Sequence, residues 1–325
     1  MHRIKYIDLF CGIGSFHHSL SLLGWECVFA CDIDENCRQT YKKNHGMEPS
    51  SDICAVDVAK IPKFDVLCGG FPCQPFSAAG HRQGFEDARG NMFLQIMRFV
   101  EHHQPEVVLL ENVLGLLNHD GGKTMTIIIS TLEQAGYHVR TKILLCSDYG
   151  IPQMRKRIFI VATKAEFPES LLNFRTVGSP TLTDFLNCGR PKSQHMTFTR
   201  KNVAYTIRCG GKHSTIDRTH NWDGYWVKKT AKSAEVVYRL TVNDCLKLQG
   251  FDENSFHLVG TVKSHWKMVG NTIPTNFTRM MGEAVDVFLR MTCATDPKHP
   301  SGNSVDEIAL KMGHVCKKIK CEEEK

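Results

Sequence analysis

The sequence contains no run of about 20 apolar residues, so no membrane-spanning helix is expected. Residues Met1 to Lys5 lack the apolar core of a signal peptide and lead directly into a predicted strand. The 14 cysteines form no Cys-x-x-Cys pair, and no cysteine–histidine cluster has the spacing of zinc ligands. We therefore expect reduced thiols, no metal site and a cytoplasmic location.

The composition sets only broad limits on function. The 325 residues are enough for a substantial core and two lobes. A content of 42% apolar and 23% charged residues is ordinary for a globular protein. The net charge of +6 is compatible with nucleic acid as a partner but does not establish it. Local motifs must therefore carry the functional argument.

Up to Thr163 the sequence alternates between apolar strand patterns and helical patterns. The first strand, the turn Cys11-Gly12-Ile13-Gly14-Ser15 and the next helix resemble the opening of a nucleotide-binding α/β unit. Strands are expected at 4–10, 25–31, 66–68, 106–113, 137–146 and 158–163. Helices are expected at 16–23, 35–43, 92–102, 123–135, 242–251 and 276–291.

Acidic residues follow the second predicted strand. Asp32 lies roughly 20 residues after the glycine turn, a position that suits hydrogen bonding to ribose hydroxyls. Asp34 is expected to be the N-cap of the following helix. Asp52 lies in a further acidic turn, where it could bind an adenine amino group.

The loop Gly69-Gly70-Phe71-Pro72-Cys73-Gln74-Pro75 follows a short apolar strand. Its two prolines exclude a helix and stiffen the loop, and its glycines permit close approach of a ligand. Most free cysteines are buried and unreactive, which is the alternative interpretation of Cys73. The flanking prolines favour a thiol presented as a nucleophile at the carboxyl end of a strand.

Two further sets of polar residues surround the predicted sheet. Glu111 and Asn112 end an apolar strand, where a buried carboxyl could act as a general acid; a helix cap or a surface salt bridge is the alternative. Gln153, Arg155 and Arg157 alternate, so they are predicted to share one face of a strand and to hold an anion. A charged edge strand is the alternative there.

The pattern changes after Thr163. Residues 190–239 contain eleven basic residues against three acidic ones, interleaved with aromatic side chains, which favours a nucleic-acid-binding lobe. The expected division is residues 1–174, a second lobe at 175–257, a return segment at 258–292 and a polar tail at 293–325. The stretch 268–274 is expected to be a turn before the last long helix.

Six motifs in order resemble those of the cytosine-C5 DNA methyltransferases of bacterial restriction–modification systems, over about residues 4–291. The motifs are Asp8-Leu9-Phe10-Cys11-Gly12-Ile13-Gly14, Gly70-Phe71-Pro72-Cys73-Gln74, Glu111-Asn112-Val113, Gln153-Met154-Arg155-Lys156-Arg157, Leu248-Gln249-Gly250-Phe251 and Gly270-Asn271-Thr272. One motif alone would be a modest signal, whereas the ordered set is specific.

The resemblance implies a class I S-adenosylmethionine-dependent methyltransferase fold, with a mixed, mostly parallel sheet and a smaller DNA target-recognition domain. Cys73 would attack C6 of a flipped cytosine, Glu111 would bind N3 and the amino group, and Arg157 would contact O2, with Arg155 and Asn112 in support. The cofactor would contact Phe10, Gly12, Ile13, Gly14, Asp32, Ile33, Asp52, Ile53, Gly70, Pro72 and Asn271. Double-stranded DNA would contact Gln74, Ser77, Thr206, Arg208 and Arg218.

The same resemblance implies a monomer in the bacterial cytosol that acts on DNA, with a partner restriction endonuclease for the same site. The recognition region is similar to those that read G/C-rich palindromes such as GGNNCC. Ile33 replaces a common aromatic residue and Ser15 a common glycine, which raises the question of how tightly the cofactor binds.

Three alternatives stay open. A tRNA cytosine methyltransferase would share the scaffold, but its Cys-Phe-Thr marker is absent from the recognition region. A catalytically silent DNA-binding module would not need Cys73, Glu111 and Arg157. A nicotinamide-dependent oxidoreductase would not need the Pro-Cys-Gln loop.

Overall fold

The computed structural model describes residues 3–72, 92–186, 196–198, 203–209, 225–229 and 234–295. Cys73, Gln74, Ser77 and Arg218 lie outside these ranges, and so does the tail after Thr295. Within the described ranges, no helix is both long and apolar enough to cross a membrane.

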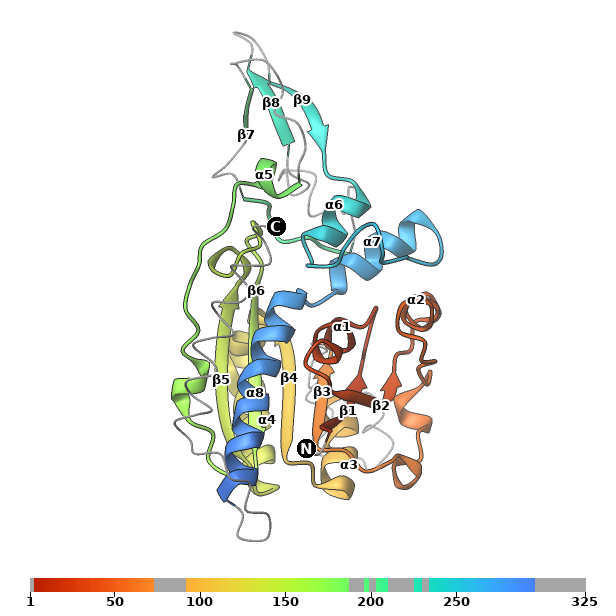
Figure 1. Ribbon diagram of the computed structural model, residues 1–325, viewed down its shortest axis with the longest axis vertical. Helices are drawn as coiled ribbons and strands as arrows, with labels where there is room; N and C mark the ends of the chain where they lie inside the picture. The colour runs from red at the N-terminus through yellow and green to blue at the C-terminus, as the bar shows by residue number, and fades with distance from the viewer. Residues whose placement is uncertain are drawn as a thin grey trace.

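A six-stranded sheet forms the body of the molecule, in the order β2-β1-β3-β4-β6-β5 (Figure 1). Strands β2, β1, β3 and β4 are parallel to one another, whereas β6 runs antiparallel to both β4 and β5. The sheet is therefore mixed and mostly parallel, and the predicted α/β fold is confirmed. The strands are β1 (Lys5–Leu9), β2 (Glu26–Cys31), β3 (Val66–Gly70), β4 (Val107–Val113), β5 (His138–Leu145) and β6 (Lys156–Thr163).

Helices cover both faces of this sheet. Val107 and Leu109 of β4 belong to the core under α1 (Ser15–Ser21) and α8 (Thr275–Thr295). Val108 and Leu110, one residue out of phase, belong to the core under α3 (Met92–His103) and α4 (Lys123–Gln134). Apolar residues on both sides of each strand explain why the strands appear in the sequence as continuous apolar runs.

The remaining short elements complete the chain. They are α2 (Glu35–His45), the 3₁₀ helices η1 (Ile53–Ala55), η2 (Val58–Lys60), η5 (Leu114–Gly122), η6 (Cys146–Asp148) and η7 (Glu169–Leu172), α5 (Leu182–Leu186) and α6 (Val242–Lys247). Strands β7 (Met196–Phe198), β8 (Tyr225–Lys229) and β9 (Ala234–Arg239) form a separate three-stranded sheet. Figure 1 shows this small sheet at one end of the molecule, beyond α6 and α7 (Val262–Asn271).

The predicted turn at 268–274 is wrong for residues 268–271, because α7 spans Val262–Asn271 and continues through Gly270, whereas residues 272–274 connect α7 to α8. Thr261 caps this helix, since its side chain accepts a hydrogen bond from the Ser264 backbone N–H. A Cβ on Gly270 would lie 2.2 Å from the backbone nitrogen of Cys209. The glycine therefore allows α7 to pack directly against the backbone of residues 203–209, and it does not mark a turn.

The end of the chain returns to its beginning. Ser15 Oγ donates a 2.7 Å hydrogen bond to the Ile273 carbonyl, and Ser19 Oγ donates a 2.9 Å bond to the Thr275 carbonyl. These bonds join α1 to the start of α8, which lies along the sheet in Figure 1. The position where Ser15 replaces a common glycine is thus used to anchor the return segment.

Candidate active site

The carboxyl ends of β1 to β4 meet at one edge of the sheet. Because β6 is antiparallel, its first residues lie at this same edge, and Arg157 pairs with Val113. A cavity of about 640 Å³ opens there. Ligands bind at this edge in open α/β sheets, so the cavity is the candidate active site.

Most of the predicted cofactor and catalytic residues line this one cavity. They are Phe10, Gly12, Ile13, Asp32, Ile33, Asp52, Ile53, Gly70, Pro72, Glu111, Asn112, Arg157 and Asn271. Gly14 and Arg155 are not among the described lining residues. At Gly14, φ is +93° and an added Cβ would lie 2.3 Å from His45 Nε2, so this glycine is required by the turn itself.

Asp32 is held in place by the backbone on both sides. The Gly12 N–H donates to Asp32 Oδ2 and the Asp34 N–H donates to Asp32 Oδ1, each at 2.8 Å. Burial raises the pKa of Asp32, and these two hydrogen bonds oppose the rise. The carboxyl group is therefore fixed in orientation within the cavity wall, as a ligand for hydroxyl groups should be.

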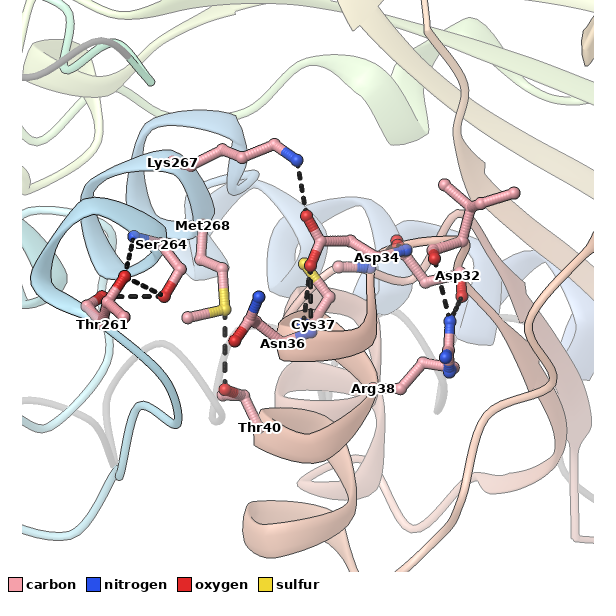
Figure 2. Close-up of polar contacts among 12 residues, drawn as sticks. Asp32, Asp34, Asn36, Cys37, Arg38, Thr40, Thr261, Ser264, Lys267 and Met268 are labelled. Carbon is pink, nitrogen blue, oxygen red and sulfur yellow. Dashed lines mark hydrogen bonds and ion pairs between the residues drawn. The ribbon is translucent and has the colours of Figure 1, made fainter.

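The loop from β2 to α2 is fixed by side chains of its own helix (Figure 2). Arg38 Nη1 donates 2.9 Å hydrogen bonds to the carbonyls of both Asp32 and Ile33. Asp34 is the N-cap of α2, as expected, since its side chain accepts from the backbone N–H groups of Asn36 and Cys37. Asp52 similarly caps η1 by accepting from the Cys54 N–H.

One part of the cavity wall is apolar. Phe10, Ile33 and Ile53 line it, and Phe10 follows β1 with φ of +56°, a left-handed backbone in which the chain turns at the strand end. Ile33 is 77% exposed, so an aliphatic side chain stands open at this wall. The faces of a flat aromatic base could pack against these apolar side chains.

The cavity lining also contains a buried charged pair. Arg157 Nε lies 2.7 Å from Glu111 Oε1, and the two side chains are 11% and 9% exposed. Burial raises the pKa of Glu111, while the guanidinium groups of Arg157 and Arg155 oppose the rise. Glu111 lies within β4 and is buried, so neither a helix cap nor a surface salt bridge describes it. Burial and the two guanidinium groups thus act on the pKa of this carboxyl in opposite directions.

The start of the cysteine loop is fixed against β4. Asn112 Nδ2 donates a 3.0 Å hydrogen bond to the Phe71 carbonyl, and Gly70 pairs with Glu111 across the sheet. A Cβ on Gly70 would lie 3.0 Å from Ile273 Cδ1 and 3.3 Å from Glu111 Oε2. The chain thus passes close to Glu111 immediately before Pro72, the last described residue ahead of Cys73.

The prediction that Gln153, Arg155 and Arg157 share one strand face is wrong, because β6 begins only at Lys156. The alternative of a charged edge strand is also wrong, since β6 lies between β4 and β5. Arg155 is fully buried and donates to the carbonyls of Ile207, Gly270 and Thr272 at 2.8, 3.0 and 2.7 Å. It therefore joins two backbone segments, at Ile207 and at Gly270 to Thr272, through three carbonyls.

Gln153 and Thr206 also join backbone segments that are distant in the sequence. Gln153 Nε2 donates to the Leu248 carbonyl at 2.8 Å, and its Oε1 accepts from the Ile207 N–H at 3.2 Å. Thr206 Oγ1 donates a 2.7 Å hydrogen bond to the Met154 carbonyl, while Arg208 is exposed. DNA contacts by Thr206 and Arg208 therefore stay predictions, as do those of the residues outside the described ranges.

Several cavity residues were missed from the sequence. Asp8, fully buried in β1, has a pKa well above its usual range because of burial and the nearby charge of Asp32. Lys267 and Met268 of α7 also line the cavity. Had α7 been predicted as a helix, the four-residue spacing of Lys267 and Asn271 would have placed both on one face.

Comparison with protein families gives an extensive match. A family model described as C-5 cytosine-specific DNA methylase matches residues 4–187 and 181–286. The type II methyltransferase M.DsaV of Dactylococcopsis salina is 34% identical over 312 residues, covering 89% of this chain and 88% of that protein. The type II methyltransferase M.HhaI of Haemophilus parahaemolyticus is 30% identical over 301 residues, covering 84% and 91%.

Solved structures agree on the fold. The Dnmt2 methyltransferase of S. pombe superposes with a TM-score of 0.68 at 20% identity, covering 88% of this chain and 99% of that one. A putative DNA modification methyltransferase of an E. coli prophage superposes with a TM-score of 0.63 at 18% identity, covering 88% and 99%.

Proposed function

Because the chain belongs to the family of C-5 cytosine-specific DNA methylases, we propose that this DNA cytosine-5-methyltransferase uses Cys73 to attack a cytosine flipped out of a short double-stranded site. It would act as a monomer and protect DNA from a cognate restriction endonuclease. One observation carries the proposal: the Glu111–Arg157 pair lies in the same cavity as Pro72, the residue before Cys73.

The cavity residues suit S-adenosylmethionine. Phe10, Ile33 and Ile53 offer an apolar wall for the adenine, and Asp32 offers a fixed carboxylate for the ribose hydroxyls. Asp52 would bind the adenine amino group, and Asn271 the methionine part. Acidic side chains outnumber basic ones among the residues that line the cavity, which favours a ligand that carries positive charge. The bound cofactor would supply an electrophilic methyl group.

The protein residues would divide the reaction into easier steps. The Cys73 thiolate adds to C6 of the cytosine, and Glu111 donates its proton to N3 as negative charge develops there. Arg157 contacts O2 and orients the ring. C5 then takes the methyl group, which would leave S-adenosylhomocysteine as the product. A base removes the C5 proton, the electrons of the broken C–H bond form the C5–C6 double bond and expel the Cys73 thiolate, and N3 returns its proton to Glu111.

The small lobe would select the DNA site. Arg208 and Arg218 are the proposed guanine contacts, with Gln74, Ser77 and Thr206 beside the flipped base or the backbone. A tRNA substrate is less favoured than DNA, because the matched family model describes DNA methylases and M.DsaV and M.HhaI are type II methyltransferases.

The test is transfer of labelled methyl from S-adenosylmethionine to unmethylated genomic DNA and, in parallel, to bulk tRNA. Bisulfite sequencing of the DNA product would identify the site. Cys73→Ser should abolish transfer while DNA binding persists, and Cys293→Ser, at an exposed cysteine of α8, should transfer methyl normally.

The outcomes separate the candidate functions. Methylation at one short palindrome supports the proposal, and methylation of tRNA alone replaces it. Retained turnover in Cys73→Ser would remove the covalent mechanism even if DNA is the substrate. Labelling of neither nucleic acid would favour a silent binding module.

A further inference from the structure

The cofactor cavity is built from two segments that are far apart in the sequence. Asp32, Ile33 and Asp34 line it from the β2–α2 loop, and Lys267 and Met268 line it from α7. The geometry of the cavity therefore depends on how α7 is held against α2.

A polar stripe on α2 holds the segment that leads into α7. Asn36, Thr40 and Asn44 are spaced by four residues and so share one helix face. Asn44 exchanges two hydrogen bonds with the His257 backbone, of 2.9 and 2.8 Å. Thr40 Oγ1 accepts from the Val259 N–H at 3.0 Å and lies 3.5 Å from Met268 Sδ. These contacts fix the segment that leads into α7, and Thr40 also contacts α7 itself at Met268, which lines the cavity.

At the cavity itself, one ion pair joins the two helices (Figure 2). Lys267 Nζ lies 2.5 Å from Asp34 Oδ2, and the side chains are 58% and 18% exposed. Asp34 also caps α2, so the pair connects α7 to the first turn of α2. Figure 2 shows the Lys267 side chain extending from α7 toward Asp34.

The pair also affects the residue that would bind the ribose. The charge of Asp34 disfavours ionisation of the neighbouring Asp32. A cation held on Asp34 offsets this repulsion, because Lys267 interacts with Asp32 as well as with Asp34. Losing the pair would thus loosen one wall of the cavity and weaken the ionised form of Asp32.

We propose that Lys267 and Asp34 are positioning residues that set the affinity for the cofactor by closing α7 onto the β2–α2 loop. The inference rests on the proposed S-adenosylmethionine site. The pair would contribute to binding of the cofactor and leave the methyl-transfer step, which takes place at Glu111 and Arg157, unaffected.

The experiment measures binding of S-adenosylhomocysteine by calorimetry, together with kcat at saturating cofactor and DNA. Lys267→Met and Asp34→Asn should each weaken binding by about two- to fivefold, the range of a partly exposed ion pair, with kcat retained within about twofold. Asparagine is an equally good N-cap, so Asp34→Asn removes the charge and keeps the helix start. The double variant should bind no more weakly than either single one, and Lys267→Arg should restore affinity.

Lys263→Met is the matched control, because Lys263 is exposed one turn earlier on the same helix. It should bind like the unaltered protein, and an equal loss there would overturn the proposal. A loss in Lys267→Met without a loss in Asp34→Asn would show that Lys267 contacts the cofactor directly, which also overturns it. Failure of the unaltered protein to bind S-adenosylhomocysteine would instead reject the proposed cofactor site.

Discussion

Replacement of Arg155 tests whether this residue positions the site or takes part in the reaction. Its guanidinium group is fully buried and binds the carbonyls of Ile207, Gly270 and Thr272. Burial lowers the pKa of Arg155 to about 9, so the group is still a cation at neutral pH. Arg155→Met would fill much of the same volume but would leave three buried carbonyls without this donor.

The expected loss of stability in Arg155→Met follows from those three hydrogen bonds. An unpaired buried polar group costs about 1–3 kcal/mol, although the variant no longer has to bury a cation. Removing one partner from a buried charged cluster typically costs about 3–5 kcal/mol, so we expect the free energy of unfolding to fall by about 4 kcal/mol. For a chain of this length, about 1 kcal/mol shifts Tm by about 1.5 °C, and Tm should fall by about 6 °C. Arg155→Lys should lose about half as much, because an ammonium group cannot span all three carbonyls.

The assay combines thermal and urea unfolding with methyl transfer measured well below Tm. Lys156→Met, at the exposed neighbouring position, is the control and should unfold like the unaltered protein. An unchanged Tm in Arg155→Met would refute the positioning role. Full stability with lost turnover in Arg155→Lys would also refute it, because that result would place the guanidinium group at the reacting base.

Three further substitutions test other parts of the site. Gly270→Ala should lose about 1–3 kcal/mol of stability in unfolding measurements, because the added Cβ would collide with the backbone of 208–209. Alanine normally favours a helix, so a more stable variant would contradict this packing. Ile33→Trp should tighten S-adenosylhomocysteine binding by about three- to tenfold in calorimetry, since an indole would cover the adenine, and unchanged affinity would place the adenine elsewhere. Because the pKa of Glu111 is raised and its protonated form is the proposed donor, kcat should fall as pH rises through that pKa. Glu111→Gln should be slower by about 10²-fold or more, and its pH–rate profile should lack this alkaline decline. An alkaline decline in both proteins would assign the decline to another group.

The sequence predicted the elements of the sheet body well because their local signals agree with the fold. The apolar run ending at Glu111 became β4, and Asp34 capped α2 as its position before a helical pattern suggested. The motifs also predicted that Asp32, Glu111 and Asn271 lie at one site, and all three line the same cavity. Asp32 and Glu111 could be placed there because the carboxyl ends of parallel strands meet at one edge of the sheet.

The errors came from interactions between distant segments. Gly270 suggested a turn because a glycine in a helix is locally unfavourable, but its reason is the backbone of 208–209, far away in sequence. Arg155 was predicted to hold an anion on a strand face because the alternation was extended back to Gln153, three residues before the true start of β6 at Lys156. Lys267 was missed because its partner, Asp34, belongs to the other end of the chain.

The joining of α1 to the start of α8 has a consequence during protein synthesis. Ser15 and Ser19 emerge from the ribosome 258 and 256 residues before their partners Ile273 and Thr275. At about 5–20 residues per second, the nascent chain would spend on the order of ten seconds or more with β1 to β4 made but one cavity wall missing. Cofactor binding would therefore require synthesis through α7, and a ribosome stalled before α7 would carry a protein that lacks this cavity wall.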